Sequence, residues 1–436
     1  MSPDASKSGA SKPDASKPGA SKPAASKPGA SKPGASKPDA SNPDARDVAA
    51  DGFVAGSAAA IDATLELMLP GDPLTATGGY EYDRRMSEGL RALGWSVRVH
   101  ALDGSFPLPT AQALNDARDR LAVLPEQSLV LIDGLALGAM PDQVCAQAQR
   151  LRLVGLVHHP LAAETGLSPG LVARLEDSER RALQATRMIV VTSDATRVAL
   201  SRYGVAPDRI VVVEPGVDRP QGAAPETRAA GAPLRMLCVA TVTPRKGHEL
   251  LVEALAGLRE HAWVLSCVGD LERSPATARA LRACIAAAGL EDRIELCGVL
   301  DSEALDRKLR QADLFVLATR FEGYGMAVTQ ALAYGLPVVS THTGAIASTV
   351  GRHAGLLVEP GDVAALRASL QRVLLDPGLH ARLAEGARAA AAKLPDWPCA
   401  SRRLSAALAR AARRTVAAPG DSQCLAAASP RGPCST

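Results

Sequence analysis

Short, continuous runs of apolar residues recur along this chain, and segments with apolar residues every three or four positions lie between them. The short runs predict buried β-strands, and the periodic segments predict amphipathic helices. Strands whose two faces are both covered by such helices are typical of parallel sheets. The expected strands are residues 64–69, 94–100, 129–133, 151–158, 188–193, 210–213, 235–242, 262–268, 293–297, 313–318, 337–341 and 355–358.

Helices are expected between most of these strands and after the last one. The stop signals are clear in places: the helix from Met326 to Tyr334 is followed by Gly335 and Pro337, which end helices well. The other expected helices are residues 81–93, 176–186, 194–203, 247–259, 275–288, 302–311, 362–375, 379–393 and 400–414.

The alternation of strand and helix extends over too many residues for one ordinary domain. A chain of 436 residues fits two domains plus tails. Eight Ala-Ser-Lys-Pro-Xaa pentads over residues 5–44 lack large apolar side chains and predict a disordered tail, residues 1–58. We expect an N-terminal domain at 59–217, a C-terminal domain at 218–395, a last helix at 396–415 and a loose tail at 416–436.

Charge and composition exclude several classes of function. The net charge of +3 comes from residues 1–45, which hold seven lysines and four aspartates, so the rest of the chain is balanced. A balanced body argues against nucleic acid as the main partner, since that partner would need a basic face. Aromatic residues make up only 3% of the chain, so leucine, valine and alanine must fill the core.

The eight cysteines show no metal-ligand spacing, and four lie in apolar strand or helix contexts. This pattern favours reduced, buried thiols and a cytoplasmic protein without structural zinc. No apolar run reaches 18 residues and no hydrophobic leader is present, so neither a membrane span nor secretion is expected. The sequence leaves peripheral contact with a membrane open.

Two cations follow the strand that ends near Val242. Arg245 offers a planar, bidentate guanidinium, and Lys246 offers a compact point charge. Past residue 45 the chain has only two other lysines, Lys308 and Lys393, whereas arginine is its common cation. The rarity of lysine suggests that Lys246 serves a specific role, and a diphosphate is the kind of group that such a pair would hold. A solvated strand end is the alternative.

A second loop follows the strand at 314–318 and reads Glu322-Gly323-Tyr324-Gly325 before the helix at Met326. Glycines let the backbone approach a ligand closely. The free N–H groups at the start of the helix attract anions. Glu322 can accept hydrogen bonds from sugar hydroxyls, and Gln330 lies about one and a half turns further along the same helix. The simpler alternative for Glu322 is a partner of the helix dipole.

The N-terminal half offers weaker signals. Gly78-Gly79 lies between a strand and a helix but does not match a dinucleotide-binding fingerprint, so a plain loop is an alternative. The strand at 151–158 ends in His158 and His159, and a histidine at a strand end can donate to a sugar hydroxyl or cap the strand.

Together these motifs resemble the GT-B retaining glycosyltransferases of family 4. The resemblance covers Thr243–Gly247, Glu322–Gly325, Ala333–Val339 and Ala354–Asp362. It implies an α/β fold of the GT-B type, in which two Rossmann-like domains face each other across a cleft. It further implies transfer of a hexose from a nucleotide-diphosphate sugar to an acceptor, with retention and without a metal or other cofactor. Two positions depart from the family: the second glutamate of its signature is Gln330 here, and Ala347-Ser348 replaces a Pro-Glu pair.

The resemblance assigns roles residue by residue. Arg245, Lys246, Glu322 and His158 would be catalytic, with His158 favoured over His159 as the contact to the hexose. The donor would be bound by Gly78, Gly79, Gly323, Tyr324, Gly325, Met326, Gln330 and the backbone around Val299, which would face the base. First-domain loops near 70–82, 103–110 and 160–170 would hold the acceptor. The partners are then a nucleotide sugar and an unknown acceptor.

Three alternatives stay open at this point. A sugar-nucleotide epimerase of the same fold would release nucleotide without an acceptor. A phosphorylase would need a cofactor lysine late in the second domain, where Lys393 is poorly placed. A regulator that binds a sugar nucleotide without turnover would explain Gln330.

Overall fold

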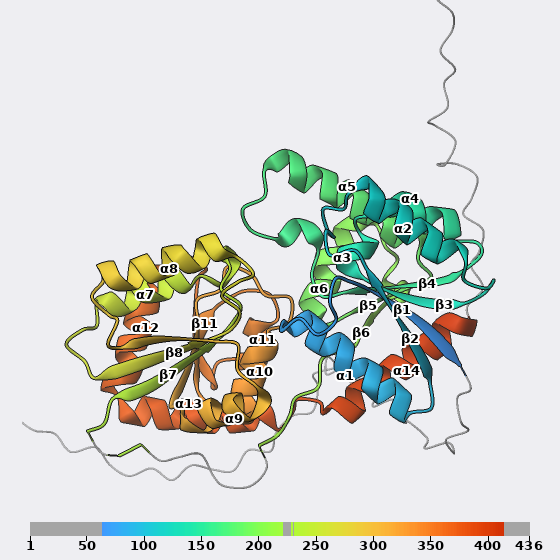
Figure 1. The fold of residues 1–436 in the computed structure, drawn as a ribbon. Coiled ribbons are helices and arrows are strands. Elements are labelled where there is room, and N and C mark those ends of the chain that lie inside the picture. The colour runs from blue at the N-terminus through green and yellow to red at the C-terminus, as the bar shows by residue number, and fades with distance from the viewer. Residues whose placement is uncertain (1–62, 221–227, 230, 414–436) are drawn as a thin grey trace, which may run out of the picture. The chain divides into compact units, whose positions relative to one another are not determined.

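The computed structural model describes residues 63–220, 228–229 and 231–413. The expected tails at 1–58 and 416–436 lie outside these residues. The predicted α/β architecture is confirmed: the described residues form two six-stranded sheets, and every strand pairing is parallel. Helices cover both faces of each sheet (Figure 1).

The N-terminal sheet has the strand order β2-β1-β3-β4-β5-β6. Its strands are β1 (Thr64–Pro70), β2 (Ser96–Leu102), β3 (Leu129–Asp133), β4 (Arg152–Val157), β5 (Met188–Val191) and β6 (Ile210–Val212). Its helices are α1 (Gly78–Ala92), α2 (Ala111–Ala122), α3 (Gly134–Leu137), α4 (Pro141–Gln147), α5 (Pro169–Ala185) and α6 (Asp194–Ala199).

The C-terminal sheet has the strand order β12-β11-β10-β7-β8-β9. Its strands are β7 (Leu234–Val239), β8 (Trp263–Val268), β9 (Ile294–Gly298), β10 (Leu314–Leu317), β11 (Val338–Thr341) and β12 (Gly355–Val358). The helices of this half are α7 (His248–Ala256), α8 (Pro275–Ala287), α9 (Ser302–Gln311), α10 (Met326–Ala333), α11 (Ile346–Val350), α12 (Val363–Leu375) and α13 (Pro377–Ala391).

Burial follows the apolar runs that predicted the strands. All residues of β3, β5, β10 and β11 are buried, as expected for central strands with helices on both faces. The edge strand β2 contains both buried and exposed residues, and its Val99 is 42% exposed. Full burial of a strand therefore marks a central position here, since the edge strand β6 is also an apolar run but is only partly buried.

The last helix, α14 (Trp397–Arg413), packs on the N-terminal sheet, although it follows the C-terminal sheet in sequence. It lies beside α1 (Figure 1), and its apolar face joins one core cluster with β1, β3 and β4. Trp95 Nε1 donates a 2.9 Å hydrogen bond to Ser405 Oγ inside this cluster. The apolar face is made by Ala400, Leu404, Ala407, Leu408 and Ala411.

Some local predictions were wrong or incomplete. The helix expected at 194–203 is α6 followed by a 3₁₀ turn at Leu200–Tyr203. Of the six described cysteines only Cys238 and Cys267 are buried; Cys145 is exposed and the other three are partly exposed. None of the six forms a disulfide. Among the described helices, none is both long and apolar enough to cross a membrane.

Each sheet has a point where the strand order reverses. In the N-terminal sheet it lies between β1 and β3, and in the C-terminal sheet between β7 and β10. Open parallel sheets bind ligands outside the carboxyl ends of the strands at such points. The loops after these four strands are therefore the candidate ligand-binding loops.

Candidate functional site

The two predicted cations lie in the loop after β7, at the reversal point of the C-terminal sheet. Pro244–Lys246 forms a 3₁₀ turn that ends at Gly247, whose φ of 65° lies in the left-handed region. A Cβ at position 247 would be 2.1 Å from the carbonyl oxygen of Ala318, so only glycine fits here. The loop is thereby pressed against the carboxyl end of β10, where the second predicted motif begins.

Arg245 and Lys246 converge on Glu322. Lys246 Nζ lies 2.6 Å from Glu322 Oε1, and Arg245 Nη1 lies 3.7 Å from the same oxygen. Arg245 Nη1 also donates a 2.8 Å hydrogen bond to the carbonyl of Phe321. The side chains of both cations are 17% exposed and that of Glu322 is 8% exposed. The structure thus brings together three of the four residues predicted to be catalytic.

Glu322 is held as a carboxylate by this environment. Burial raises the pKa of Glu322, but the charges of Lys246 and Arg245 more than offset this, and the net pKa lies below its ordinary value. With Glu322 ionised, Arg245, Lys246 and Glu322 together carry one net positive charge, and the half-exposed Glu164 contacts Arg245 from outside this group. Such a cluster attracts a doubly charged anion more strongly than it attracts a neutral ligand.

Two helices begin beside this cluster. Gly325 caps α10 with a φ of 90°, and Gly78 is the first residue of α1. A Cβ at Gly78 would lie 3.7 Å from Met326 Sδ, so the first turns of the two helices are in contact. Free backbone N–H groups and the positive ends of both helix dipoles therefore meet near Gly78 and Met326, which favours a bound anion.

The glycine loop packs against the end of β4. A Cβ at Gly323 would be 2.1 Å from the carbonyl oxygen of His158, and Ser193 Oγ donates a 2.7 Å hydrogen bond to the Gly323 carbonyl. Tyr324 is only 7% exposed, so its ring packs inward and its backbone forms the loop. Gly323, Tyr324 and Gly325 thus place the loop next to His158.

His158 lies at the end of β4 with its ring edge against Gly79, where a Cβ would be 3.5 Å from His158 Cδ2. Its Nε2 atom faces two buried carboxylates, Asp83 Oδ1 at 3.5 Å and Asp133 Oδ2 at 3.4 Å. The facing atoms of the three side chains lie within 4.8 Å of one another, close enough to share a proton or a small cation. Sequence reasoning missed both aspartates as site residues.

His159 faces the same region but differs in its electrostatics. Its ring lies 5.9 Å from that of Phe321, and Nε2 lies 4.0 Å from Glu164 Oε2. Burial, together with the positive charges of Arg245 and His158, lowers the pKa of His159 to about 3. His159 is therefore a neutral imidazole at neutral pH. Glu164 also approaches Arg245, with 3.3 Å between its Oε2 and Arg245 Nε.

Two predicted donor residues lie apart from this cluster. Gln330, in the second turn of α10, donates a 2.9 Å hydrogen bond from Nε2 to the carbonyl oxygen of Asp218. Val299 follows β9 at the edge of the sheet, and its side chain is 56% exposed. The roles assigned to them, at the ribose and the base, stay predictions.

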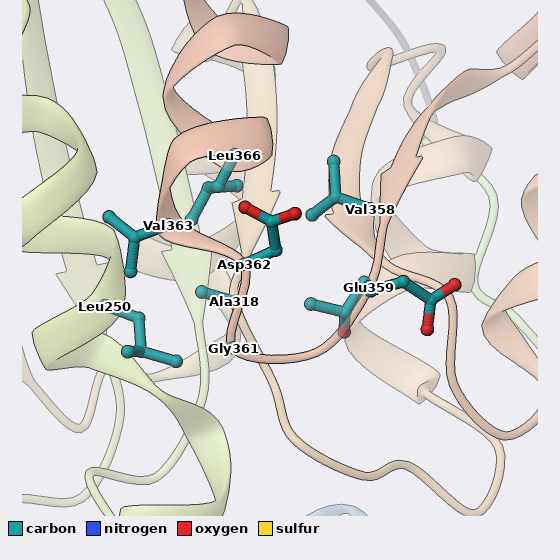
Figure 2. A pocket seen from close by; sticks show the side chains of 9 residues that line it. Leu250, Ala318, Val358, Glu359, Gly361, Asp362, Val363 and Leu366 are labelled. Atoms are coloured by element: carbon teal, nitrogen blue, oxygen red, sulfur yellow. The ribbon is translucent and has the colours of Figure 1, made fainter.

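A separate small pocket lies at the carboxyl ends of β10, β11 and β12 and is shown in Figure 2. Its walls are mostly apolar and include Leu250, Val358 and Leu366. Asp362 lines it as well, but its Oδ1 accepts a 2.8 Å hydrogen bond from Ala365 N and caps α12. Because none of the predicted site residues lines this pocket, we assign it no role.

Two family profiles match consecutive parts of this chain. Residues 81–220 match glycosyltransferase family 4, and residues 224–390 match glycosyl transferases group 1. The D-inositol 3-phosphate glycosyltransferase of Xylanimonas cellulosilytica is 30% identical over 61% of this chain and 68% of its own length. The chain therefore belongs to the glycosyltransferase family that these two profiles describe.

Other relatives agree with this assignment. The MMP α-(1→4)-mannosyltransferase of Mycolicibacterium hassiacum is 29% identical over 72% of this chain and 77% of its own length. Matches to several further D-inositol 3-phosphate glycosyltransferases span between 48% and 62% of those proteins. The enzymatic class, glycosyltransferase, is common to them all.

Solved structures confirm the GT-B fold of this glycosyltransferase. Sucrose-phosphate synthase from Thermosynechococcus elongatus superimposes with a TM-score of 0.68 over 80% of this chain and 98% of that protein, at 21% identity. Anabaena HepE in complex with UDP-glucose gives a TM-score of 0.62 over 80% of this chain and 99% of that protein, at 17% identity.

Proposed function

We propose that this glycosyltransferase moves a hexose from a nucleotide-diphosphate sugar to an acceptor hydroxyl, with retention and without a metal ion. The observation that supports this best is the cluster of Arg245, Lys246 and Glu322 beside the start of α10. Two cations and a set of backbone N–H groups suit a diphosphate, and a carboxylate among them suits sugar hydroxyls.

In the proposed reaction the bond between the sugar's anomeric carbon and the diphosphate oxygen breaks, and a bond to the acceptor oxygen forms. Negative charge grows on the departing diphosphate, where Arg245, Lys246 and the N–H groups of α10 would stabilise it. Fixed charges directed at a developing anion are among the strongest catalytic effects. The acceptor's proton would pass to the departing phosphate, so that no separate base is required.

Glu322 would orient the hexose, and His158 would contact it from the N-terminal domain. Lys246 and Glu322 already hold each other at 2.6 Å, which fixes both side chains before a ligand arrives. Because Arg245 and Lys246 supply the positive charge that a metal ion would otherwise supply, the proposal needs no metal. Retention of the anomeric configuration is part of the proposal because the resemblance to retaining glycosyltransferases implies it.

The loops assigned to the acceptor favour an acceptor without negative charge. Residues 70–82, 103–110 and 160–170 contain no lysine or arginine, but they contain four carboxylates: Asp72, Glu81, Asp103 and Glu164. Two exposed leucines, Leu74 at 79% and Leu108 at 54%, lie in the same loops. Glu81 pairs with Arg84 and Arg85, and Glu164 pairs with Arg245, so Asp72 and Asp103 are the carboxylates that would repel a phosphorylated acceptor. We therefore propose an uncharged and partly apolar acceptor.

The deciding experiment incubates the protein with glucose and mannose donors carrying uridine, guanosine or adenosine diphosphate, with EDTA present. Alkyl glucosides and sugar phosphates serve as acceptors. Acceptor-dependent nucleotide release supports transfer, and NMR of the product shows whether the anomeric configuration is retained. Release without acceptor would favour the epimerase, and binding without release would favour the regulator.

A further inference from the structure

The imidazole of His158 is enclosed by two carboxylates that come from different elements. Asp83 lies on α1 and Asp133 at the end of β3, and both are only 3% exposed. Both face the same nitrogen, Nε2, at 3.5 Å and 3.4 Å. Buried aspartates are rare unless a partner compensates their charge, and the imidazole is the group placed between them.

The backbone and ring of His158 are fixed from the remaining sides. Thr192 Oγ1 and Thr196 Oγ1 donate to its carbonyl oxygen at 3.3 Å and 3.2 Å. The ring of Tyr82 meets the imidazole edge-on, with 5.4 Å between centroids. The His158 side chain nevertheless keeps 20% of its surface exposed. The ring is therefore held in one orientation while part of it stays open to a ligand.

The charges around the ring favour its protonated form. Burial alone lowers the pKa of His158, but Asp133 and Asp83 more than offset this and raise it to about 10. Burial raises the pKa of Asp83 to about 6, against the opposing effect of His158. Three further titratable groups lie near these side chains. Burial raises the pKa of Tyr82, burial and the charge of Asp133 raise the pKa of Tyr80, and His159 is neutral.

Neither Asp83 Oδ1 nor His158 Nε2 makes a hydrogen bond of ordinary geometry with any described residue. A proton on Nε2 that both carboxylates attract is the simplest way to compensate these buried atoms. Asp133 is anchored independently, because its Oδ1 accepts a 2.9 Å hydrogen bond from Leu135 N at the start of α3. Its second oxygen is thereby directed at the imidazole.

We propose that Asp83 and Asp133 are positioning residues that keep His158 as an imidazolium, with Nε2–H directed at the carboxylates and Nδ1–H free to donate to the donor sugar. The contact to the sugar rests on the proposed function. The charge state of the ring does not, since it follows from the two carboxylates alone.

The first test is NMR of the imidazole nitrogens in the full-length protein without donor, with His158→Gln identifying the resonance. Both nitrogens should stay protonated from pH 6 to pH 8.5. In Asp133→Asn, which keeps an oxygen for Leu135 N, the ring should lose its proton within this range. Asp142→Asn, an exposed aspartate of the same domain, is the matched control. A neutral His158 in the wild type at pH 7.5 would overturn the proposal. The proposal would also be overturned if the wild type bound one divalent cation per chain tightly and the Asp133→Asn variant did not.

The second test is the pH profile of transfer. The alkaline limb of kcat/KM should move down by about two pH units in Asp83→Asn, as expected when one neighbouring charge is lost. The Asp83→Glu variant keeps a carboxylate at this position and should show the wild-type pH profile. If Asp83→Asn does not fold, Asp133→Asn replaces it. An Asp83→Asn profile with the wild-type shape would contradict the proposal. Absence of transfer in the wild type would contradict the proposed function but leave the NMR result valid.

Discussion

The side-chain amide of Gln330 donates a 2.9 Å hydrogen bond to the carbonyl oxygen of Asp218. This contact ties α10, the helix that begins beside Glu322, to the segment that follows the N-terminal sheet. The Asp218 carboxylate in turn contacts Arg85 of α1, whose guanidinium lies 5.1 Å from the ring centroid of Trp397. An amide can donate to a carbonyl oxygen, and a carboxylate cannot. The glutamine at this position is therefore explained by a contact within the chain.

Gln330→Glu should lower stability and leave donor binding intact. The carboxylate would lose the hydrogen bond to Asp218 and face a carbonyl oxygen, which costs about 1 kcal/mol and lowers Tm by roughly 2–4 °C. It could still accept hydrogen bonds from a ribose, so the donor Kd should hold or improve. Thermal unfolding and calorimetric titration measure the two effects. A collapse in donor binding would argue against a ribose contact.

Lys246→Ala should reduce turnover by at least about a hundredfold, because the loss of one charge contact to the departing diphosphate costs roughly 2.7–4 kcal/mol. Lys308→Ala is a matched control, since Lys308 also pairs with a carboxylate, 2.6 Å from Glu295, but on the surface of the same domain. Steady-state kinetics with a saturating donor measures the effect. Equal kcat values for the two variants would show that Lys246 does not act in the site.

Gly323→Ala should abolish or strongly reduce transfer, because its Cβ would be 2.1 Å from the His158 carbonyl oxygen. Forcing an atom into a packed contact costs about 1–3 kcal/mol and shifts the loop that carries Glu322. Gly170→Ala is the control, since a Cβ there meets nothing within 4 Å. Activity and Tm should be measured together for both variants. A fully active Gly323→Ala protein would show that the loop does not need this contact.

Glu179→Gln should alter the pH dependence of folding. Glu179 is 1% exposed, and its Oε2 accepts from Leu161 N and Tyr203 Oη at 3.1 Å and 2.9 Å. Burial, opposed by these hydrogen bonds, raises its pKa from 4.5 to about 7. Because the folded state holds this proton more tightly, the wild type loses stability as pH rises from about 4.5 to 7.

The glutamine cannot ionise. The free energy of unfolding of Glu179→Gln, relative to that of the wild type, should therefore rise between about pH 4.5 and 7 and stay constant above pH 7. Chemical unfolding at pH 4.5, 6, 7 and 8 gives the free energies needed. Glu176→Gln, at a half-exposed position of the same helix, is the control and should show no such rise. A difference that is flat with pH would contradict the raised pKa.

Most of the fold could be predicted because each half repeats a strand, a loop and a helix with clear end signals. Sequence and structure agree on α10, which begins at Met326 in both. The helix α2 gave no usable signal, since it buries only Ala113, Ala117 and Leu121 and is otherwise polar. A line of two alanines and one leucine is too weak to distinguish such a helix from a loop.

The site could be predicted only in part, for a related reason. Arg245, Lys246 and Glu322 follow strands directly, and neighbouring strand ends lie at one edge of a parallel sheet. Asp83 lies in the charged segment Glu81–Arg85, where local sequence cannot show which acid is buried. Its partners come from β3 and β4, 50 or more residues away, so only the packing of α1 on the sheet reveals its role.

The return of α14 to the N-terminal sheet affects how the protein can be made. Ribosomes deliver a chain from its N-terminus, and early domains often fold before the rest is synthesised. Here Ala400, Leu404 and Leu408 complete a cluster whose other members come mainly from α1 and from strands β1 to β5. The N-terminal domain therefore cannot exclude water from this cluster until α14 has been synthesised. A nascent chain stalled before residue 397 should carry an exposed apolar face suited to chaperone binding.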